Sequence, residues 1–319
     1  MKITQITSYF LLVFIGITTV ACSQNNRSIA FYNVENLFDT KDDPNKDDQE
    51  FLPDADRQWN DERYTEKIKH INQVFGLFEN PMIIGVCEIE NEQVVRDVVN
   101  YGTMKSKYGV VHYESLDERG IDVALIYDSS SLKLAQSGFI RYNMPEGDRP
   151  SRDIVWSKLI QGKDTILAMV NHWPSRSGGE EKSEPKRMIA ANAARKFIDS
   201  VQIASPKTKI VFMGDLNDYP TNNSAKLIAE VLTPMITKAS GEYKGSYNYR
   251  GEWDVLDHIM VSSNFFGKKK GIVKDSGKIY SNDFLLEVYK GDTVPFRTYG
   301  GKKYLGGYSD HLPVSIGVK

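Results

Sequence analysis

Eight short runs rich in valine and isoleucine recur along the chain, and they limit the folds that it can adopt. Most are bounded by Gly, Asp, Asn or Pro, as β-strands that end in turns usually are. Because so many strands exceed a simple βαβ sheet, and helices fall between them, we predict an α+β sandwich of two sheets with helices outside. The runs, starting at residues 28, 82, 122, 153, 164, 209, 256 and 312, are SIAFYNV, MIIGVCEI, DVALIYD, DIVWSKLI, DTILAMVNHW, KIVFMGDL, LDHIMVSS and LPVSIGV.

Two stretches carry the apolar spacing of amphipathic helices. One begins at Asn60 and ends at Asn80-Pro81. The other follows Ser183, with Pro185 suited to its first turn. Between residues 39 and 61 the chain is rich in Asp, Pro and Lys, which predicts a long surface loop. This loop lacks the Gly and the terminal Glu of an EF-hand, so we do not interpret it as a calcium loop.

The first 22 residues have the pattern of an export signal. Lys2 is followed by an apolar run over residues 9–20, which is too short for a comfortable membrane span. Cys22 after Ala21 resembles the lipobox of bacterial lipoproteins, although Thr19 stands where Leu is usual; an ordinary signal peptide cut nearby is the alternative. We therefore expect a signal peptide over residues 1–22 ending in the lipobox cysteine, and one domain over residues 23–319. The expected location is the periplasm, or the outer membrane or cell surface as a lipoprotein.

Cysteine usage and charge restrict the chain further. Cys22 and Cys87 are the two cysteines, so lipidation of Cys22 would leave no internal disulfide. Cys87 lies in an apolar run, where we expect a buried, inert thiol. The formal net charge is −2, and it becomes about −3 if Lys2 leaves with the signal. A polyanion would therefore have to be held by local groups such as Arg176, Lys182, Lys186, Arg187 or the run of lysines 268–270.

Polar side chains stand at or near one end of seven strands. Each of them alone is an ordinary turn residue. Strand ends can converge, however, and together these amides, carboxylates and imidazoles form the set that a hydrolytic site needs. They are Asn33 in FYNVENLF, Glu88 in GVCEIEN, Arg119 and Asp122 in ERGIDVALIY, His172 in VNHWPSR, Asp215 and Asn217 in MGDLND, Asp257 in WDVLDHIMVS, and Asp310 with His311 in YSDHLPV.

In this order the motifs resemble the endonuclease/exonuclease/phosphatase superfamily, which includes pancreatic-type deoxyribonuclease, abasic-site endonucleases, inositol-polyphosphate phosphatases and bacterial sphingomyelinases. GDLN after an apolar strand and SDHLPV near the end are the most specific marks, and the resemblance runs from Ser28 to the C-terminus. It implies a four-layer sandwich with two mixed β-sheets packed face to face and helices on both outer sides. It looks most like the exported bacterial nucleases of that superfamily.

The resemblance implies a Mg²⁺ or Mn²⁺ ion held by Glu88 and Asp310, with Asn33 adding a neutral oxygen. Oxygen-only ligands suit these ions. Asp215 would orient or deprotonate the attacking water, and Asn217 would hold that water or the phosphate.

Two histidines are implied as phosphate contacts. His311 would meet the phosphate as an imidazolium, because Asp257 accepts its other N–H and raises its pKa. His172 is similar to the second phosphate-binding histidine of the family, with Asp122 as the candidate for its supporting carboxylate. Arg149 and Arg152 are further candidates for phosphate contact, and Tyr247, Tyr249 and Trp253 are candidates for stacking on bases or a sugar ring.

These residues predict hydrolysis of a phosphate ester without identifying the ester. The first hypothesis is an exported metal-dependent phosphodiesterase, an endonuclease or exonuclease, although the nearly neutral charge is unusual for a protein that binds duplexes. The second is a phosphatase or sphingomyelinase-type esterase acting on inositol phosphates or phospholipids. The lack of an evident amphipathic membrane-penetrating stretch in the sequence counts against action on lipids. The third is a non-catalytic binding lipoprotein, which would be expected to have lost acidic ligands. We expect a monomer that binds nucleic acid and meets a membrane only through a lipid anchor.

Overall fold

The computed structural model describes residues 26–104, 107–267 and 270–319. The predicted signal peptide, Cys22 and the lysines 268 and 269 lie outside the described residues. Within those ranges, no helix combines the length and the apolar character needed to cross a membrane.

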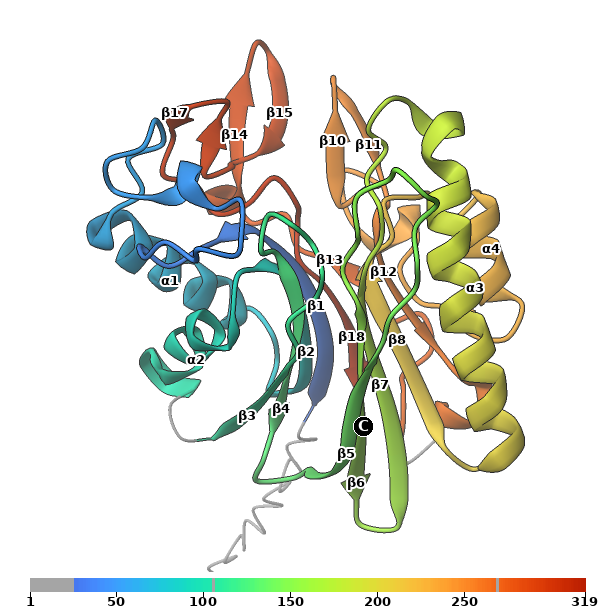
Figure 1. Cartoon of the computed structure of the whole chain (residues 1–319). Helices are drawn as coiled ribbons and strands as arrows, with labels where there is room; N and C mark the ends of the chain where they lie inside the picture. Colours follow the sequence, from blue (N-terminus) through green and yellow to red (C-terminus); the bar gives the residue numbers. More distant parts are fainter. Residues whose placement is uncertain (1–25, 105–106, 268–269) are drawn as a thin grey trace, which may run out of the picture.

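The described residues form two six-stranded mixed sheets that pack face to face, which confirms the predicted sandwich (Figure 1). In the first sheet the strand order is β13-β18-β1-β2-β4-β3, and in the second it is β5-β6-β7-β8-β12-β9. The first sheet comprises β1 (Arg27–Leu37), β2 (Pro81–Ile89), β3 (Tyr108–His112), β4 (Asp122–Asp128), β13 (Lys278–Ile279) and β18 (Val314–Val318). The second comprises β5 (Lys133–Ile140), β6 (Ile154–Gln161), β7 (Asp164–His172), β8 (Lys209–Asp215), β9 (Thr233–Pro234) and β12 (Asp257–Val261).

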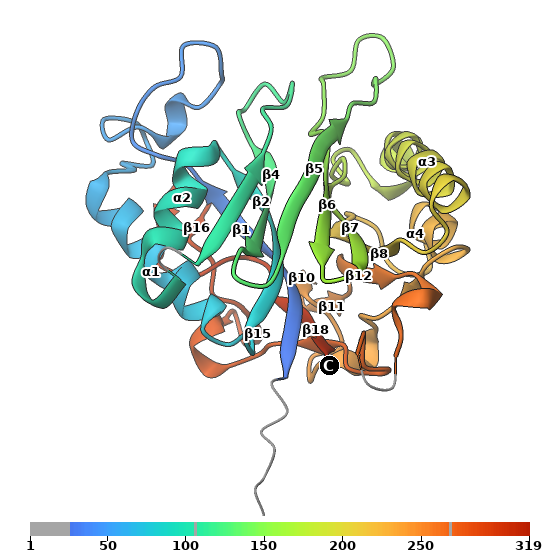
Figure 2. The same ribbon diagram turned by 90° about the horizontal axis from the view of Figure 1, so that it is seen from below.

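Helices cover the outer faces of both sheets, which completes the four layers (Figures 1 and 2). The first sheet is covered by α1 (Asp61–Phe75) and α2 (Glu92–Asn100), and the second by α3 (Glu180–Ala204) and α4 (Asn223–Ala229). α1 begins where predicted, because the Asn60 side chain accepts a hydrogen bond from the N–H of Arg63. α3 begins earlier than predicted, at Glu180, so Pro185 lies beyond its first turn.

Three short hairpins project at one end of the sandwich (Figure 1), and the sequence did not predict them. They are β10 (Tyr247–Tyr249) with β11 (Glu252–Asp254), β14 (Leu286–Tyr289) with β15 (Asp292–Pro295), and β16 (Tyr299–Gly300) with β17 (Lys303–Tyr304). β10 also contacts the segment before β18, where Tyr247 forms an isolated bridge with His311.

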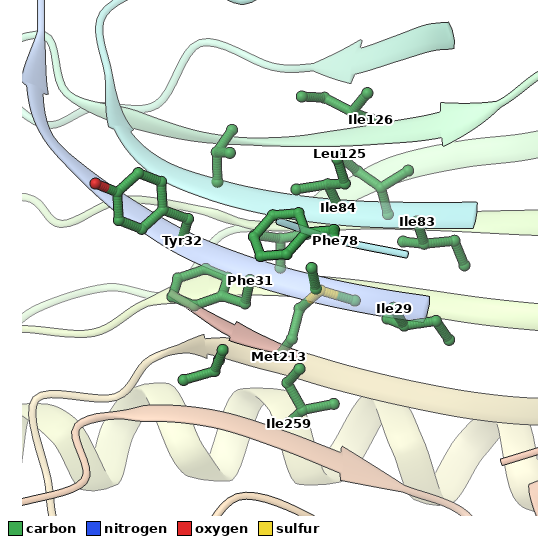
Figure 3. Close-up of a cluster of buried hydrophobic side chains, with 14 of the residues drawn as sticks. Ile29, Phe31, Tyr32, Phe78, Ile83, Ile84, Leu125, Ile126, Met213 and Ile259 are labelled. Carbon is green, nitrogen blue, oxygen red and sulfur yellow. The ribbon is translucent and has the colours of Figure 1, made fainter. Parts of the chain in front are cut away.

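The main core lies between the two sheets. Figure 3 shows Phe31 of β1 together with Met213 of β8 and Ile259 of β12. Gly85 in β2 makes room for this contact, because a Cβ there would lie 2.7 Å from the sulfur of Met213. Cys87 is buried in the same core, and burial raises the pKa of its thiol well above the usual value. The predicted inert thiol is thus in apolar surroundings.

The predicted loop after β1 is irregular, but part of it is buried against the rest of the fold. It contains a single 3₁₀ turn at Gln49–Phe51. Phe51 and Trp59 are buried against Phe38 and Tyr299, and the Trp59 indole N–H donates to the carbonyl of Phe38 at 2.9 Å. This aromatic cluster attaches the loop to the end of the sandwich that carries the hairpins.

Candidate active site

Three neighbouring strands of the second sheet each place one predicted site residue at the same edge. β7 and β8 run parallel, and their register pairs His172 with Asp215. β12 runs antiparallel to β8, and its first residue, Asp257, is also paired with Asp215. Because adjacent strands lie about 5 Å apart, the register brings these three side chains together.

Glu88 lies at a β-bulge in β2. Cys87 pairs with Val123 of β4 and Ile89 pairs with Asp122, so Glu88 is an extra residue without a partner. Its φ of +61° is unusual for a residue other than glycine. Bulges redirect a side chain, and Glu88 accordingly lines the pocket although the strand continues to Ile89.

Asn33 lies within β1 and presents its amide nitrogen, not its oxygen, to the acidic side chains. Nδ2 donates to Glu88 Oε1 and to Asp215 Oδ2, both at 3.1 Å. Oδ1 accepts the backbone N–H of Glu35 at 3.0 Å, which requires an oxygen at that position. In this arrangement Asn33 holds the two carboxylates beside each other, and its predicted role as an oxygen ligand stays a prediction.

His311 is the paired imidazole that the sequence predicts. Its Nδ1 lies 2.8 Å from Asp257 Oδ2, and its Nε2 lies 3.7 Å from Asp215 Oδ2. Burial alone would lower the pKa of His311, but the negative charges of Asp257 and Asp215 raise it well above the usual value. The ring is therefore an imidazolium at neutral pH.

Asp215 lies at the centre of the site and is buried. Burial raises the pKa of Asp215 to about 7; His311 opposes this rise and the charge of Asp257 adds to it. A carboxylate with this pKa can take up a proton near neutral pH. Asn217 holds it in place, because the Asn217 backbone N–H donates to Asp215 Oδ1 at 2.8 Å.

Asp122 does not lie beside His172 as we expected. Its Oδ2 is 3.1 Å from His112 Nε2, and its Oδ1 accepts the backbone N–H of Ser115 at 3.0 Å. These contacts occupy Asp122 in the first sheet, away from the pocket. The structure thus gives it a positioning role in the β3–β4 connection.

His172 reaches the pocket without a carboxylate on its far nitrogen. Its Nδ1 is buried and has no hydrogen-bond partner among the described residues. Burial and the positive charge of Arg152 lower the pKa of His172 well below the usual value. The ring is therefore neutral, and its Nε2 lies 3.9 Å from Glu88 and 3.7 Å from Asp215.

Charged residues that the sequence did not predict hold Asp310. Arg297 Nη2 donates to Asp310 Oδ2 at 2.7 Å, and its Nε lies 3.5 Å from Glu35 Oε1. Glu35 is buried and accepts the backbone N–H of Thr298 at 2.6 Å. Lys67 of α1 is also buried and donates to the Thr298 hydroxyl. Asp310 is therefore oriented by the half-exposed Arg297, which the buried Glu35 contacts from the interior.

One sequence signal could have found Lys67. It lies three and four residues from Tyr64 and Ile71, on the apolar stripe of α1, where an unpaired charge would be costly. Arg297 in VPFRTYG belongs to no motif and gives no such signal.

The donor chemistry of the site fits a hard divalent cation. Glu88 and Asp310 both line the pocket with carboxylate oxygens, which Mg²⁺ and Mn²⁺ prefer. The charges of Asp257 and Glu88 also raise the pKa of Asp215, so a nearby cation would relieve this repulsion. Two groups of three donors, all within 4.8 Å of one another, occur among the described residues: Asp215, Asp257 and His311, and His112, Glu114 and Asp122.

The site opens into a pocket of about 630 Å³. Asn33 and Asp257 lie behind its wall. Arginines and tyrosines both line it, and the Tyr247 ring lies 4.7 Å from that of His311. The predicted residues in its lining are Glu88, Arg119, Arg152, His172, Arg176, Asp215, Asn217, Tyr247, Tyr249, Asp310 and His311.

Comparison with known proteins agrees with this geometry. Residues 28–319 match the model of the Endonuclease/Exonuclease/phosphatase family. Comparison with curated proteins gives no significant match.

Solved structures similar in fold include three proteins of low sequence identity. A mannosyl-6-phosphatase from Bacteroides thetaiotaomicron has a TM-score of 0.60 and 14% identity, covering 92% of this chain and 99% of that one. The catalytic domain of human Nocturnin with bound sulfate gives 0.55 and 15%, covering 92% and 94%. An endonuclease/exonuclease/phosphatase from Bacteroides vulgatus gives 0.57 and 14%, covering 92% and 98%. At such identity the likeness establishes the fold.

Proposed function

Because the chain belongs to the endonuclease/exonuclease/phosphatase family, we propose that it is a metal-dependent phosphodiesterase that hydrolyses nucleic acid. The observation that carries this proposal is the convergence of Glu88, Asp215, His172, Asp310 and His311 on one pocket. Acids, a protonated imidazole and a neutral imidazole around one cavity are suited to binding and cleaving a phosphate ester.

Glu88 and Asp310 would hold the cation. When bound, a divalent cation neutralises phosphoryl oxygens and the charge that develops on the leaving oxygen. Arg297 fixes Asp310 and Asn33 fixes Glu88, so both carboxylates are oriented before a substrate arrives.

Asp215 is the group that accepts a proton from the attacking water. The oxygen of that water bonds to phosphorus, the bond to the leaving oxygen breaks, and the leaving oxygen takes a proton from solvent. Asn33 and Asn217 keep the Asp215 carboxylate in one orientation. The His311 imidazolium lies beside it and can bind a phosphoryl oxygen through Nε2, because Nδ1 is engaged by Asp257.

A second candidate is a phosphomonoesterase acting on a sugar or inositol phosphate. Its support is the exposed ring of Tyr249 in the pocket wall, on which a sugar ring can stack, together with the net charge of −2. One structural neighbour is a mannosyl-6-phosphatase. The same catalytic residues would serve this reaction.

The test is turnover by the purified protein with Mg²⁺ or Mn²⁺ on a panel of substrates. The panel contains single-stranded and plasmid DNA, RNA, bis-p-nitrophenyl phosphate, mannose 6-phosphate, inositol phosphates and sphingomyelin. We expect cleavage of nucleic acid and of the small diester, abolished by EDTA and by Asp310→Asn. Asp275→Asn is the matched control, since Asp275 is exposed and its positive φ suits Asn.

Selective release of phosphate from monoesters would overturn the diesterase proposal in favour of the second candidate. Activity that survives both EDTA and Asp310→Asn would contradict the metal assignment.

Export, lipidation of Cys22 and the monomeric state are further proposals from the sequence. Metabolic labelling with a radioactive fatty acid should mark the wild-type protein but not Cys22→Ser. Unlabelled wild-type protein in the culture supernatant would favour an ordinary signal peptide instead.

A further inference from the structure

A second pocket adjoins the catalytic pocket and shares part of its wall. This groove of about 330 Å³ lies between residues 117–119, 144–152 and 174–186. Arg119, Arg152, Ser175 and Ser177 line both cavities. A ligand bound at the catalytic residues can therefore extend directly into this space, which we call the Arg149–Lys186 groove.

Positive charge exceeds negative charge in this groove. Its lining contains four cationic side chains and three carboxylates. The excess arises because Asp117 pairs with both Arg119 and Arg152. Arg149 and Lys186 each have one carboxylate partner of their own. A chain with a net charge of −2 thus carries a local positive surface beside its catalytic site.

Of the two arginines that the groove shares with the catalytic pocket, Arg152 is held in place. Arg152 is buried and donates to Asp117 Oδ2 at 3.2 Å and to the Trp173 carbonyl at 2.6 Å. Its Nε is buried with no hydrogen-bond partner in the described part of the chain. Burial raises the pKa of the Asp117 carboxyl, but the two arginines, Arg152 first, bring it below the usual value. This part of the groove is therefore a permanent positive wall.

The cations farther out are free to exchange partners. The Arg149 side chain is 74% exposed and lies 3.2 Å from Glu118. The Lys186 side chain is 35% exposed and lies 2.5 Å from Asp148. Exposed ion pairs of this kind contribute little net free energy, so an incoming phosphate can replace either carboxylate at little cost.

Neutral donors also line the wall that the two cavities share. Ser175 and Ser177 are exposed and belong to both cavities. From the following helix, α3, Ser183 and Lys186 line the groove.

We propose that the Arg149–Lys186 groove binds the phosphate next to the scissile one, so that the substrate is a nucleic-acid strand with at least two phosphates. This proposal rests on the proposed function. The exposed Tyr249 ring in the catalytic pocket supplies a stacking surface outside the groove. A strand offers both an adjacent phosphate for the groove and a base for the tyrosine, whereas a sugar monophosphate would leave the groove empty.

The experiment compares substrates with one and with several phosphates. Wild type and the double variant Arg149→Gln/Lys186→Gln are assayed on bis-p-nitrophenyl phosphate, on a dinucleotide with one phosphate, and on oligonucleotides of three to eight residues. We expect the double variant to raise KM for the longer oligonucleotides about tenfold with kcat unchanged, and to leave both one-phosphate substrates unaffected. The slope of log KM against log salt should fall by about 1 to 2 for the longer substrates.

Lys196→Gln is the matched control, because it removes the same charge from an exposed position on the same helix outside the groove. Arg149→Lys/Lys186→Arg should retain the wild-type KM. In EDTA, anisotropy of a labelled octanucleotide should show the same loss of affinity in the double variant, which separates binding from turnover.

Equal KM changes for one-phosphate and longer substrates, or no change for either, would overturn the groove assignment. In that case, turnover of the small diester by the wild-type protein would still support the proposed function. A KM effect confined to inositol polyphosphates would overturn the strand as occupant. Absence of wild-type turnover on every diester would overturn both proposals.

Discussion

Asp310 and His311 are neighbours in sequence, but their side chains contact different partners. The His311 backbone N–H donates to the Ser309 hydroxyl at 3.1 Å, and that hydroxyl donates to the Asn33 carbonyl at 2.7 Å. This turn directs His311 toward Asp257 and leaves Asp310 with Arg297. Two adjacent ionisable residues can thus serve one pocket from two directions.

The first prediction concerns the Asp257 carboxylate. Asp257→Asn should lower kcat by about 10²–10⁴, the usual range for a group that supports acid–base or phosphate chemistry, because His311 loses the partner that keeps it charged. Steady-state kinetics on bis-p-nitrophenyl phosphate give the value. Asp254→Asn, three residues earlier on β11, should match wild type, and a normal kcat in Asp257→Asn would remove the pair from the mechanism.

The second prediction concerns a histidine outside the pocket. His258 is buried, with Nε2 at 2.9 Å from the Asp218 carbonyl, and burial lowers its pKa. Its unfolded pKa is about 6.5, so protons bind the unfolded state more tightly. The stability that the neutral ring supplies is present above that pH and is lost as pH falls below it.

His258→Gln keeps the donor and cannot titrate, so its free energy of unfolding should decline less between pH 6.5 and 5. The difference should approach about 1.4 kcal/mol per pH unit for one proton. Urea unfolding at several pH values measures it, and parallel pH curves for the two proteins would contradict this account.

At the scale of elements, the site depends on strand register. The sequence predicts β7, β8 and β12 from their apolar runs and identifies His172, Asp215 and Asp257 beside them. It does not contain the pairing that aligns these residues, because register follows from contacts between distant strands. The bulge at Glu88 could not be predicted for the same reason, because it is defined by the pairing of β2 with β4.

Where a side chain finds its partner is also a property of the packed elements. Asp122 is the first residue of β4, and its partner His112 comes from the neighbouring strand β3. The motif residues could be named from the sequence, whereas Lys67 reaches Thr298 from 231 residues away, and Arg297 contacts Asp310 from outside any motif. Local patterns cannot encode such contacts.

The third prediction concerns Gly214, the residue before Asp215 in β8. A Cβ at Gly214 would lie 2.3 Å from the Asn171 carbonyl oxygen of β7. Gly214→Ala should therefore push β7 and β8 apart, costing about 1–3 kcal/mol in unfolding free energy as overpacking does, and lowering kcat because Asp215 moves.

Gly147→Ala is the control for this substitution. Gly147 also has a positive φ, +84°, but a Cβ there meets nothing within 4 Å. It should show only the cost of backbone strain and an unchanged kcat. Equal losses of stability in the two variants, by urea titration, would show that the close strand contact is unimportant.

At the scale of the molecule, one core joins both sheets. Phe31 of the first sheet and Met213 of the second pack into the same buried cluster. Trp59 and Trp173 lie in two separate, smaller clusters. Because neither sheet can bury its inner face alone, we expect the described fold to unfold as a unit.

The fourth prediction follows. Two variants, one keeping only Trp59 and the other only Trp173, have the remaining tryptophans changed to Phe. In each variant, the urea midpoint measured by tryptophan fluorescence should equal the midpoint measured by circular dichroism. Fluorescence and far-UV signals measure this. Midpoints that separate would mean that the two halves of the sandwich fold independently.

The pairing of Arg27 with Val318 in the first sheet has a topological consequence. Asn33 lies farther along β1, so both ends of the described fold sit at the end of the sandwich opposite the pocket. The first and last residues of the described fold are thus close together in space. A short linker between them, with new ends opened at Gly162 in the turn between β6 and β7, would give a circular permutant whose catalytic strands keep their neighbours.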